Sequence, residues 1–122
     1  MRACITPDPS TIELVGEWDI GRVAVLRRRL DDLLKEGRPL VVDLGRATFL
    51  DSTALGVLLG ARTAWEQRGL AMALVVNDGT AYTVRNAIHL LGIDRIFPVF
   101  STMDEATGRL RIAGCYLEVT DV

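Results

Sequence analysis

The chain has little of what metal centres and nucleophilic enzymes are built from. Among its 122 residues there is one histidine, His89, and there are two cysteines, Cys4 and Cys115. A zinc site needs about four nitrogen, sulfur or oxygen ligands, and a Ser-His-Asp triad needs a histidine beside its nucleophile. Nothing at metal-ligand spacing accompanies the cysteines, so we expect no metal and two reduced thiols. His89 lies in a helical pattern and is expected on the helix surface.

Long apolar runs and an excess of positive charge are also missing. No run approaches the roughly 18 apolar residues that a membrane span needs, and the N-terminus lacks the apolar core of a signal peptide. The net charge is −2, from 14 basic and 16 acidic side chains, which gives no electrostatic footprint for nucleic acid. We therefore expect a cytoplasmic protein, one domain over residues 1–122, that contacts neither membrane nor nucleic acid directly.

The sequence lacks the glycine-rich loops that hold nucleotides, since neither G-x-x-x-x-G-K-[ST] nor G-x-G-x-x-G after a strand is present. Asp19, Asp43 and Asp51 could suggest the magnesium pocket of a phosphoryl-receiver domain. Asp43, however, is embedded in a strand pattern, and Lys35 is the only lysine in the chain. An enzyme on a flavodoxin-like frame is therefore the least favoured interpretation, and we expect no enzyme and no cofactor.

What the sequence does contain is a regular alternation of strand and helix patterns. Short β-branched runs predict strands, and apolar residues at three- and four-residue steps predict helices. Strands are expected at 1–7, 11–17, 39–44, 70–76 and 95–100, and helices at 20–36, 52–68, 80–91 and from about 101 onward.

Turn and cap residues set the boundaries of these elements. Two prolines within 7–10 predict a turn that joins the first two strands as a hairpin. Asp19 is expected to be the N-cap of the first helix. Residues 45–48 are expected to form a loop, and Pro98 is expected to mark an edge strand because it cannot donate to a ladder.

The order β-β-α-β-α-β-α-β-α is typical of an α/β fold with a mixed, mostly parallel sheet of four to five strands and about four helices. Binding sites in such sheets tend to lie at the carboxyl ends of the strands. Residues 17–19, 50–53 and 77–79 follow strand patterns and are expected to meet there. Asp19 and Asp51 would then flank Ser52.

The most informative segment is Phe49-Leu50-Asp51-Ser52-Thr53-Ala54-Leu55-Gly56, which joins a strand pattern to a helix pattern. A helix N-terminus carries unpaired N–H groups and about half a positive charge, so it tolerates an added anion. Ser52 is therefore a candidate phosphorylation site. The plainer interpretation, that Asp51 or Ser52 is only the N-cap, stays open. Gly56 and Gly60 each cost about 1 kcal/mol relative to alanine in a helix, which suggests close packing against a neighbouring element or room left for a partner, with close packing favoured.

These residues resemble the STAS family, and within it the single-domain anti-sigma factor antagonists. The resemblance covers about 11–110 and leaves 111–122 as a C-terminal extension that could be a strand or a docked tail. Ala54 stands where many members have glycine, a change that a first helical turn accommodates easily. The segments that carry the resemblance are Leu14-Val15-Gly16-Glu17-Trp18-Asp19, Val41-Val42-Asp43-Leu44, Phe49 to Gly56 and Leu91-Gly92-Ile93.

The resemblance implies partner switching. Such a protein, when unphosphorylated, binds an anti-sigma factor, usually also a serine kinase of the histidine-kinase-like ATPase superfamily, and thereby frees a sigma factor. The kinase phosphorylates the antagonist and dismisses it, and a phosphatase resets the cycle. The family's phosphorylated serine falls on Ser52, with Thr53 as a rival acceptor, and its acidic partner-binding residue falls on Asp19. We expect a monomer whose contact residues are Asp19, Asp51, Ser52, Thr53, Leu55 and Gly56.

A second interpretation within the same family is a constitutive STAS adaptor, a subunit of a stress-signalling or lipid-transport complex. In that case Ser52 would serve the helix start alone and would not be modified. The partner would distinguish the two interpretations, since a kinase-like anti-sigma factor favours the switch and transporter subunits favour the adaptor.

Overall fold

The computed structural model describes residues 8–110. The predicted strand 1–7 with its hairpin, the tail 111–122 and both cysteines lie outside the described residues. In chain order the elements are β1 (Ser10–Glu13), β2 (Gly16–Trp18), α1 (Val23–Lys35), β3 (Leu40–Asp43), β4 (Ala47–Leu50), α2 (Ser52–Gln67), β5 (Met72–Val75), α3 (Tyr82–Leu90), α4 (Ile93–Ile96), β6 (Val99–Phe100) and a helical stretch at 103–110.

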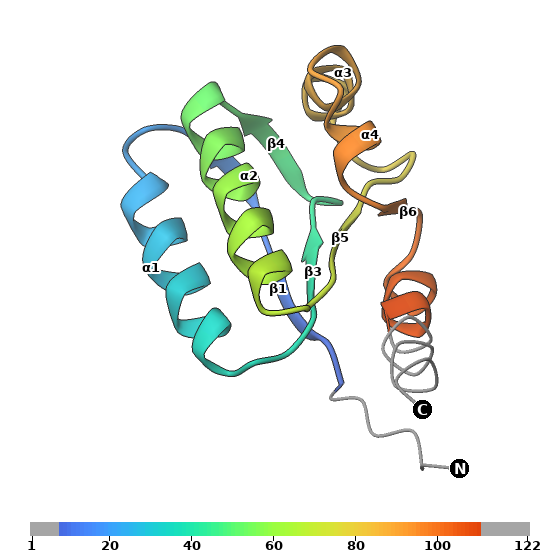
Figure 1. The fold of residues 1–122 in the computed structure, drawn as a ribbon. Coiled ribbons are helices and arrows are strands. Elements are labelled where there is room, and N and C mark those ends of the chain that lie inside the picture. Colours follow the sequence, from blue (N-terminus) through green and yellow to red (C-terminus); the bar gives the residue numbers. More distant parts are fainter. Residues whose placement is uncertain (1–7, 111–122) are drawn as a thin grey trace, which may run out of the picture.

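A four-stranded sheet with the order β1-β3-β5-β6 forms the centre of the fold (Figure 1). All three of its ladders are parallel. The central strands β3 and β5 are buried along almost their whole length, as strands with both faces covered must be. The α/β class and the mostly parallel sheet that the alternating patterns predicted are thus confirmed, and every ladder among residues 8–110 is parallel.

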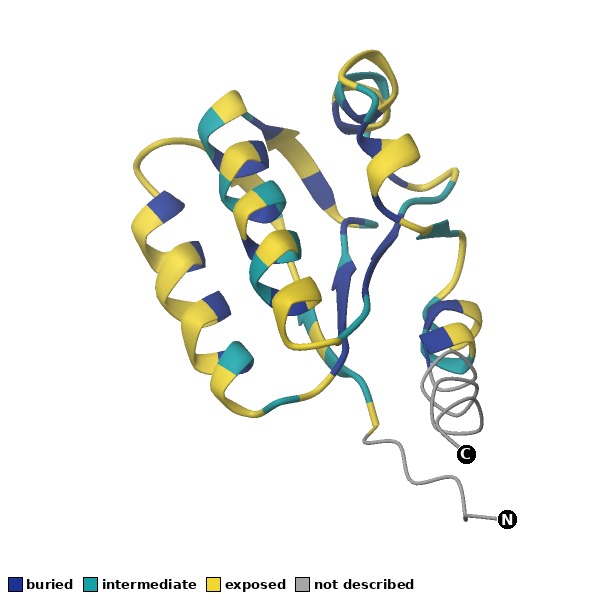
Figure 2. Cartoon of the chain, in the orientation of Figure 1, coloured by how far each residue is buried: buried dark blue, intermediate teal, exposed yellow. Residues whose placement is uncertain are grey.

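Alternate residues of the central strands pack against helices on opposite faces of this sheet. Leu40 and Val42 of β3 belong to the larger hydrophobic core, together with the inner sides of α1 and α2. Val41 belongs to a smaller core that includes Ala106 from the stretch 103–110. Figure 2 shows α1 and α2 side by side, each with buried residues along one side and exposed residues along the other.

A second, two-stranded sheet made of β2 and β4 was not predicted. The predicted strand 11–17 is interrupted after Glu13, where the chain leaves the first sheet, and the predicted loop 45–48 is replaced from Ala47 onward by β4. Thr48 and Phe49 are both exposed. Because β4 therefore lacks the alternation of buried and exposed residues that signals a strand, its pattern resembled a loop.

Helix α1 begins later than predicted, and Asp19 is not its cap. Residues 20–22 form a turn, and Arg22, the residue before the helix, makes no capping hydrogen bond with its side chain. The Asp19 carboxylate instead accepts a hydrogen bond from the Gly21 N–H at 2.9 Å. This short-range bond stabilises a turn in competition with the helix, which starts only after it.

The predicted strand 95–100 is also shorter than expected. Ile93 and Phe97 are both buried and joined by a backbone hydrogen bond of 2.9 Å, so residues 93–96 form the helical turn α4. Only the last two residues of the predicted strand pair as β6. The expected edge position is confirmed for the described residues, in which β6 is the last strand of its sheet. The Pro98 carbonyl still accepts a hydrogen bond from the Leu74 N–H.

Candidate functional site

The connection from β4 to α2 brings Ser52 to the surface. Asp51 has an extended backbone, with φ −82° and ψ 175°, and its carboxylate accepts a hydrogen bond from the Ala54 N–H at 2.9 Å. Asp51 is therefore the N-cap of α2. The capping role that the sequence left open between two residues belongs to Asp51, and the Ser52 hydroxyl takes no part in it.

Ser52 is the first residue of α2, and its side chain is exposed. Within residues 8–110 its hydroxyl makes no hydrogen bond, and the backbone N–H groups of Ser52 and Thr53 have no acceptor. Thr53 is partly buried, so Ser52 is the more accessible of the two hydroxyls. An anionic group attached to Ser52 would lie at the positive end of the helix dipole, close to unpaired N–H groups.

Replacing Asp51 by alanine is expected to destabilise the fold by about 1 kcal/mol, because the Ala54 N–H loses its acceptor. Urea unfolding followed by circular dichroism measures this loss. Asp51→Asn keeps a side-chain oxygen at the cap and is expected to lie within about 0.5 kcal/mol of the wild type. An alanine variant as stable as the wild type would contradict the capping role.

The ladder between β2 and β4 brings Asp19 to the same end of the small sheet. Trp18 lies opposite Leu50, and the Trp18 carbonyl accepts a hydrogen bond from the Asp51 N–H at 3.2 Å. Asp19 follows Trp18 directly and is exposed. Two of the three segments expected to meet therefore lie together, because they follow the ends of adjacent parallel strands.

The third segment, 77–79, lies at the other end of β4, so its predicted approach to Ser52 was wrong. The Asn77 amide donates to the Ser101 carbonyl at 3.2 Å. The same amide nitrogen lies 3.6 Å from the position that a Cβ on Gly45 would occupy, just before β4 begins. The cause is β4 itself, which carries the chain away from the end of β3 before α2 starts.

Two exposed apolar side chains lie beside these acidic groups and were missed as candidate site residues. Ile20 is 74% exposed in the turn after Asp19, and Phe49 is 43% exposed on β4, where its register partner is Glu17. The sequence pattern predicts Ile20 as the start of a helix. The combination of an aspartate with a glycine two positions later is a turn signal that could have identified its place.

The two remaining candidate contact residues, Leu55 and Gly56, lie on different sides of α2: one is buried and the other is exposed. Leu55 is only 4% exposed and belongs to the hydrophobic core, so its side chain packs α2 against the core and is not on the surface. Gly56 is exposed, and a Cβ on Gly56 or Gly60 would have no atom within 4 Å apart from those of the adjacent residues and the surrounding helix backbone. The close packing predicted from these glycines is therefore wrong. They line an open groove of about 270 Å³ between α1 and α2.

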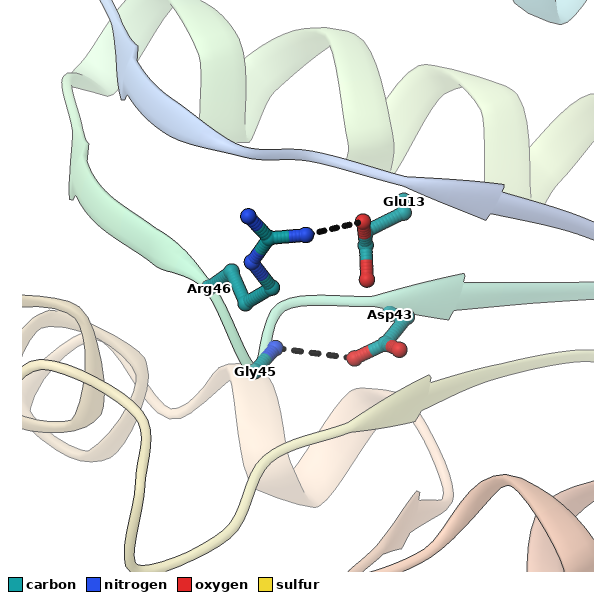
Figure 3. A network of polar contacts seen from close by, with 4 residues as sticks. All are labelled: Glu13, Asp43, Gly45 and Arg46. Carbon is teal, nitrogen blue, oxygen red and sulfur yellow. Dashed lines mark hydrogen bonds and ion pairs between the residues drawn. The ribbon is translucent and has the colours of Figure 1, made fainter.

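The acidic residues of the described part of the chain do not form a metal-binding pocket. Figure 3 shows that the Asp43 carboxylate accepts a hydrogen bond from the Gly45 N–H, at 2.8 Å, while Arg46 forms an exposed ion pair with Glu13 at 3.4 Å. Asp43 thus shapes the turn before β4. Within residues 8–110 no group of three or more histidine, cysteine, aspartate or glutamate side chains could hold a metal ion. His89 is exposed, as predicted, with its ring nitrogen 3.7 Å from Asp94.

The chain belongs to the STAS domain family, whose model matches residues 1–106. The resemblance stated from the sequence is thereby confirmed. Over 104 residues it is 32% identical to the anti-sigma-F factor antagonist RsfB of Mycobacterium tuberculosis, which covers 84% of this chain and 81% of RsfB. In the described part of the chain, no helix combines the length and apolar character needed to cross a bilayer.

Solved structures show the same fold. An anti-sigma factor antagonist from Mycobacterium paratuberculosis matches with a TM-score of 0.71 at 28% identity, covering 85% of this chain and 86% of its own. The anti-sigma factor antagonist SpoIIAA in its unphosphorylated form matches with a TM-score of 0.71 at 24% identity, over 88% of this chain and 92% of its own. The phosphorylated form of SpoIIAA from Bacillus matches with a TM-score of 0.62 at 22% identity, over 86% and 93%.

Proposed function

We propose that this protein is an anti-sigma factor antagonist that acts by partner switching. The unphosphorylated form binds an anti-sigma factor that is also a serine kinase, and a sigma factor is released. Phosphorylation of Ser52 abolishes the complex, and a phosphatase restores the binding form. In this role the protein is a binding module without an enzymatic activity of its own, and it acts in the bacterial cytoplasm.

The observation that carries this proposal is the exposed hydroxyl of Ser52, which makes no hydrogen bond within residues 8–110 and lies on the first turn of a helix that Asp51 already caps. A serine that acted as the N-cap would accept a hydrogen bond from a backbone N–H of the first helical turn, and Ser52 does not have that role. The names of the relatives, which describe anti-sigma factor antagonists, support the same role.

The charge around Ser52 supports a kinase partner with a basic docking surface. Glu17 and Asp19 are exposed, and Asp51 is partly exposed. Ile20 adds an apolar side chain to this acidic surface. Aromatic or aliphatic anchors surrounded by polar groups are typical of protein–protein interfaces. We propose that Asp19, Ile20, Ser52 and Gly56 meet the partner, with Thr53 at the margin.

Phosphorylation at this place need not disturb the fold. Phosphoserine adds nearly two negative charges at neutral pH, and the start of α2 offers the free N–H groups of Ser52 and Thr53. The partner is affected differently, because a phosphate among acidic residues must be desolvated in the complex and repels any acidic group facing it. The same modification thus leaves the antagonist folded and causes it to dissociate from the complex.

Mass spectrometry tests the proposal directly. The protein is incubated with ATP and the histidine-kinase-like anti-sigma factors of its own genome, each purified, and the product is analysed as intact protein and as peptides. One added phosphate located on Ser52, and absent from Ser52→Ala, is the expected result. Binding without any phosphate would favour the constitutive adaptor. A phosphate on Thr53 alone would contradict the assignment of the site.

A further inference from the structure

Arg22 holds the open edge of β2. Within the described residues β2 pairs only with β4, so its other edge has no neighbouring strand. The carbonyls of Val15 and Glu17 point to that edge, since alternate residues of a strand present their backbone groups to the same side. One guanidinium nitrogen of Arg22, Nη1, donates to the Glu17 carbonyl at 2.8 Å and to the Val15 carbonyl at 3.3 Å.

The same guanidinium stacks on Trp18, with its central carbon 3.8 Å from the ring centroid. Trp18 is 7% exposed and is part of the hydrophobic core, so it forms a fixed platform. The planar guanidinium can stack on the ring and donate both hydrogen bonds at once, whereas a lysine ammonium can donate but has no planar group to stack. Arg22 thus contacts both the backbone along β2 and the side chain of Trp18.

These contacts fix the turn that presents Asp19 and Ile20. The turn is closed at its base by the hydrogen bond from the Arg22 N–H to the Asp19 carbonyl, at 3.0 Å. On the other side, the Trp18 carbonyl accepts a hydrogen bond from the Asp51 N–H, and this bond links β2 to the start of α2. The position of Asp19 relative to Ser52 is therefore set through Trp18 and Arg22.

We propose that Arg22 is a positioning residue of the partner-binding surface: it holds the turn 19–22 in the orientation in which Asp19 and Ile20 meet the anti-sigma factor together with Ser52. This inference rests on the proposed function. Arg22 itself need not touch the partner. Without it the turn must be ordered when the complex forms, and ordering a loop at an interface costs affinity.

The test compares Arg22→Ala and Arg22→Lys with Arg28→Ala, a matched loss of charge at an exposed position of α1 whose side chain makes no hydrogen bond or ion pair within residues 8–110. Two readouts are measured. Hydrogen exchange at the Gly21 amide, which donates to Asp19, reports the turn without any partner. Phosphorylation kinetics with the kinase that modifies the wild-type chain report the surface.

For Arg22→Ala we expect the Gly21 amide to exchange about tenfold faster, and the KM for the antagonist to rise about tenfold with kcat unchanged. Arg22→Lys is expected to recover part of both, and Arg28→Ala is expected to match the wild type. Unchanged exchange and KM in Arg22→Ala would overturn the inference, as would an equal effect of Arg28→Ala. If no kinase modifies or binds the wild type, the proposed function fails, whereas the exchange measurement still decides whether Arg22 holds the turn.

Discussion

Ser52→Asp is expected to bind the anti-sigma factor about tenfold to a hundredfold more weakly than Ser52→Ala, which keeps wild-type affinity. The physical reason is charge: aspartate adds one negative charge to an acidic surface, whereas phosphoserine adds nearly two and a larger group. For phosphorylated Ser52 we expect a penalty of about 3–4 kcal/mol, more than a hundredfold in affinity. Isothermal titration calorimetry with the four forms of the protein measures the series.

The chain offers a matched control for this series. Ser101 is also exposed and lies shortly before the helical stretch 103–110. Ser101→Asp adds the same charge in a similar local setting but away from Asp19 and Asp51, so it is expected to leave the affinity unchanged. Equal affinities of Ser52→Ala and Ser52→Asp would contradict the role of Ser52. A loss in Ser101→Asp as large as that in Ser52→Asp would mean that overall charge, not position, governs binding.

The start of α2 could be predicted from sequence because several local signals agree there. A buried strand, a capping aspartate and an apolar-periodic run all point to a helix that begins at Ser52, and α2 does begin there. The sequence could not decide which residue was the cap. Aspartate and serine are both favoured N-cap residues, so only the bond from the Ala54 N–H to the Asp51 carboxylate settles it.

The neighbourhood of Asp19 could not be predicted in the same way. Ile20 and Val23 have the three-residue spacing of one helix face, yet Ile20 is exposed in a turn. Two contacts fix the conformation of this turn: the Gly21 N–H donates to the Asp19 carboxylate, and the Arg22 side chain donates to the Glu17 carbonyl. Arg22 acts across the turn on β2, and contacts of this kind leave no periodic trace in a sequence.

The open groove beside Gly56 and Gly60 shows a different limit. Glycine in a helix indicates that a side chain would be unfavourable there, but it does not say whether the space is filled by a neighbour or kept free. Here no atom from outside the adjacent residues and the local helix backbone lies within 4 Å of the position that either missing Cβ would occupy. Side chains at these two positions would therefore fit the fold. The glycines keep the groove side of α2 open, next to the proposed docking surface.

Trp65→Ala is expected to destabilise the fold by about 3–5 kcal/mol. Trp65 is 1% exposed and belongs to the core between α1 and α2, and its indole N–H donates to the Arg38 carbonyl at 2.9 Å. The substitution removes both the packing and this link between α2 and the segment that leads into β3. Urea unfolding followed by circular dichroism measures the loss without relying on tryptophan fluorescence.

The two tryptophans provide an internal comparison, because only one of them uses its polar atom. Trp65→Phe loses the hydrogen bond to Arg38, for which we expect about 1–2 kcal/mol. The buried indole N–H of Trp18 has no partner in the described part of the chain, so Trp18→Phe removes an unsatisfied donor, which offsets the smaller ring. We expect Trp18→Phe to lower the free energy of unfolding by less than Trp65→Phe does, and the reverse order would contradict this account.

Trp65 lies in the last turns of α2 and Ser52 in the first. Under conditions in which Trp65→Phe is folded, we therefore expect it to bind the anti-sigma factor with wild-type affinity. Stability and partner affinity are thereby separated along one helix.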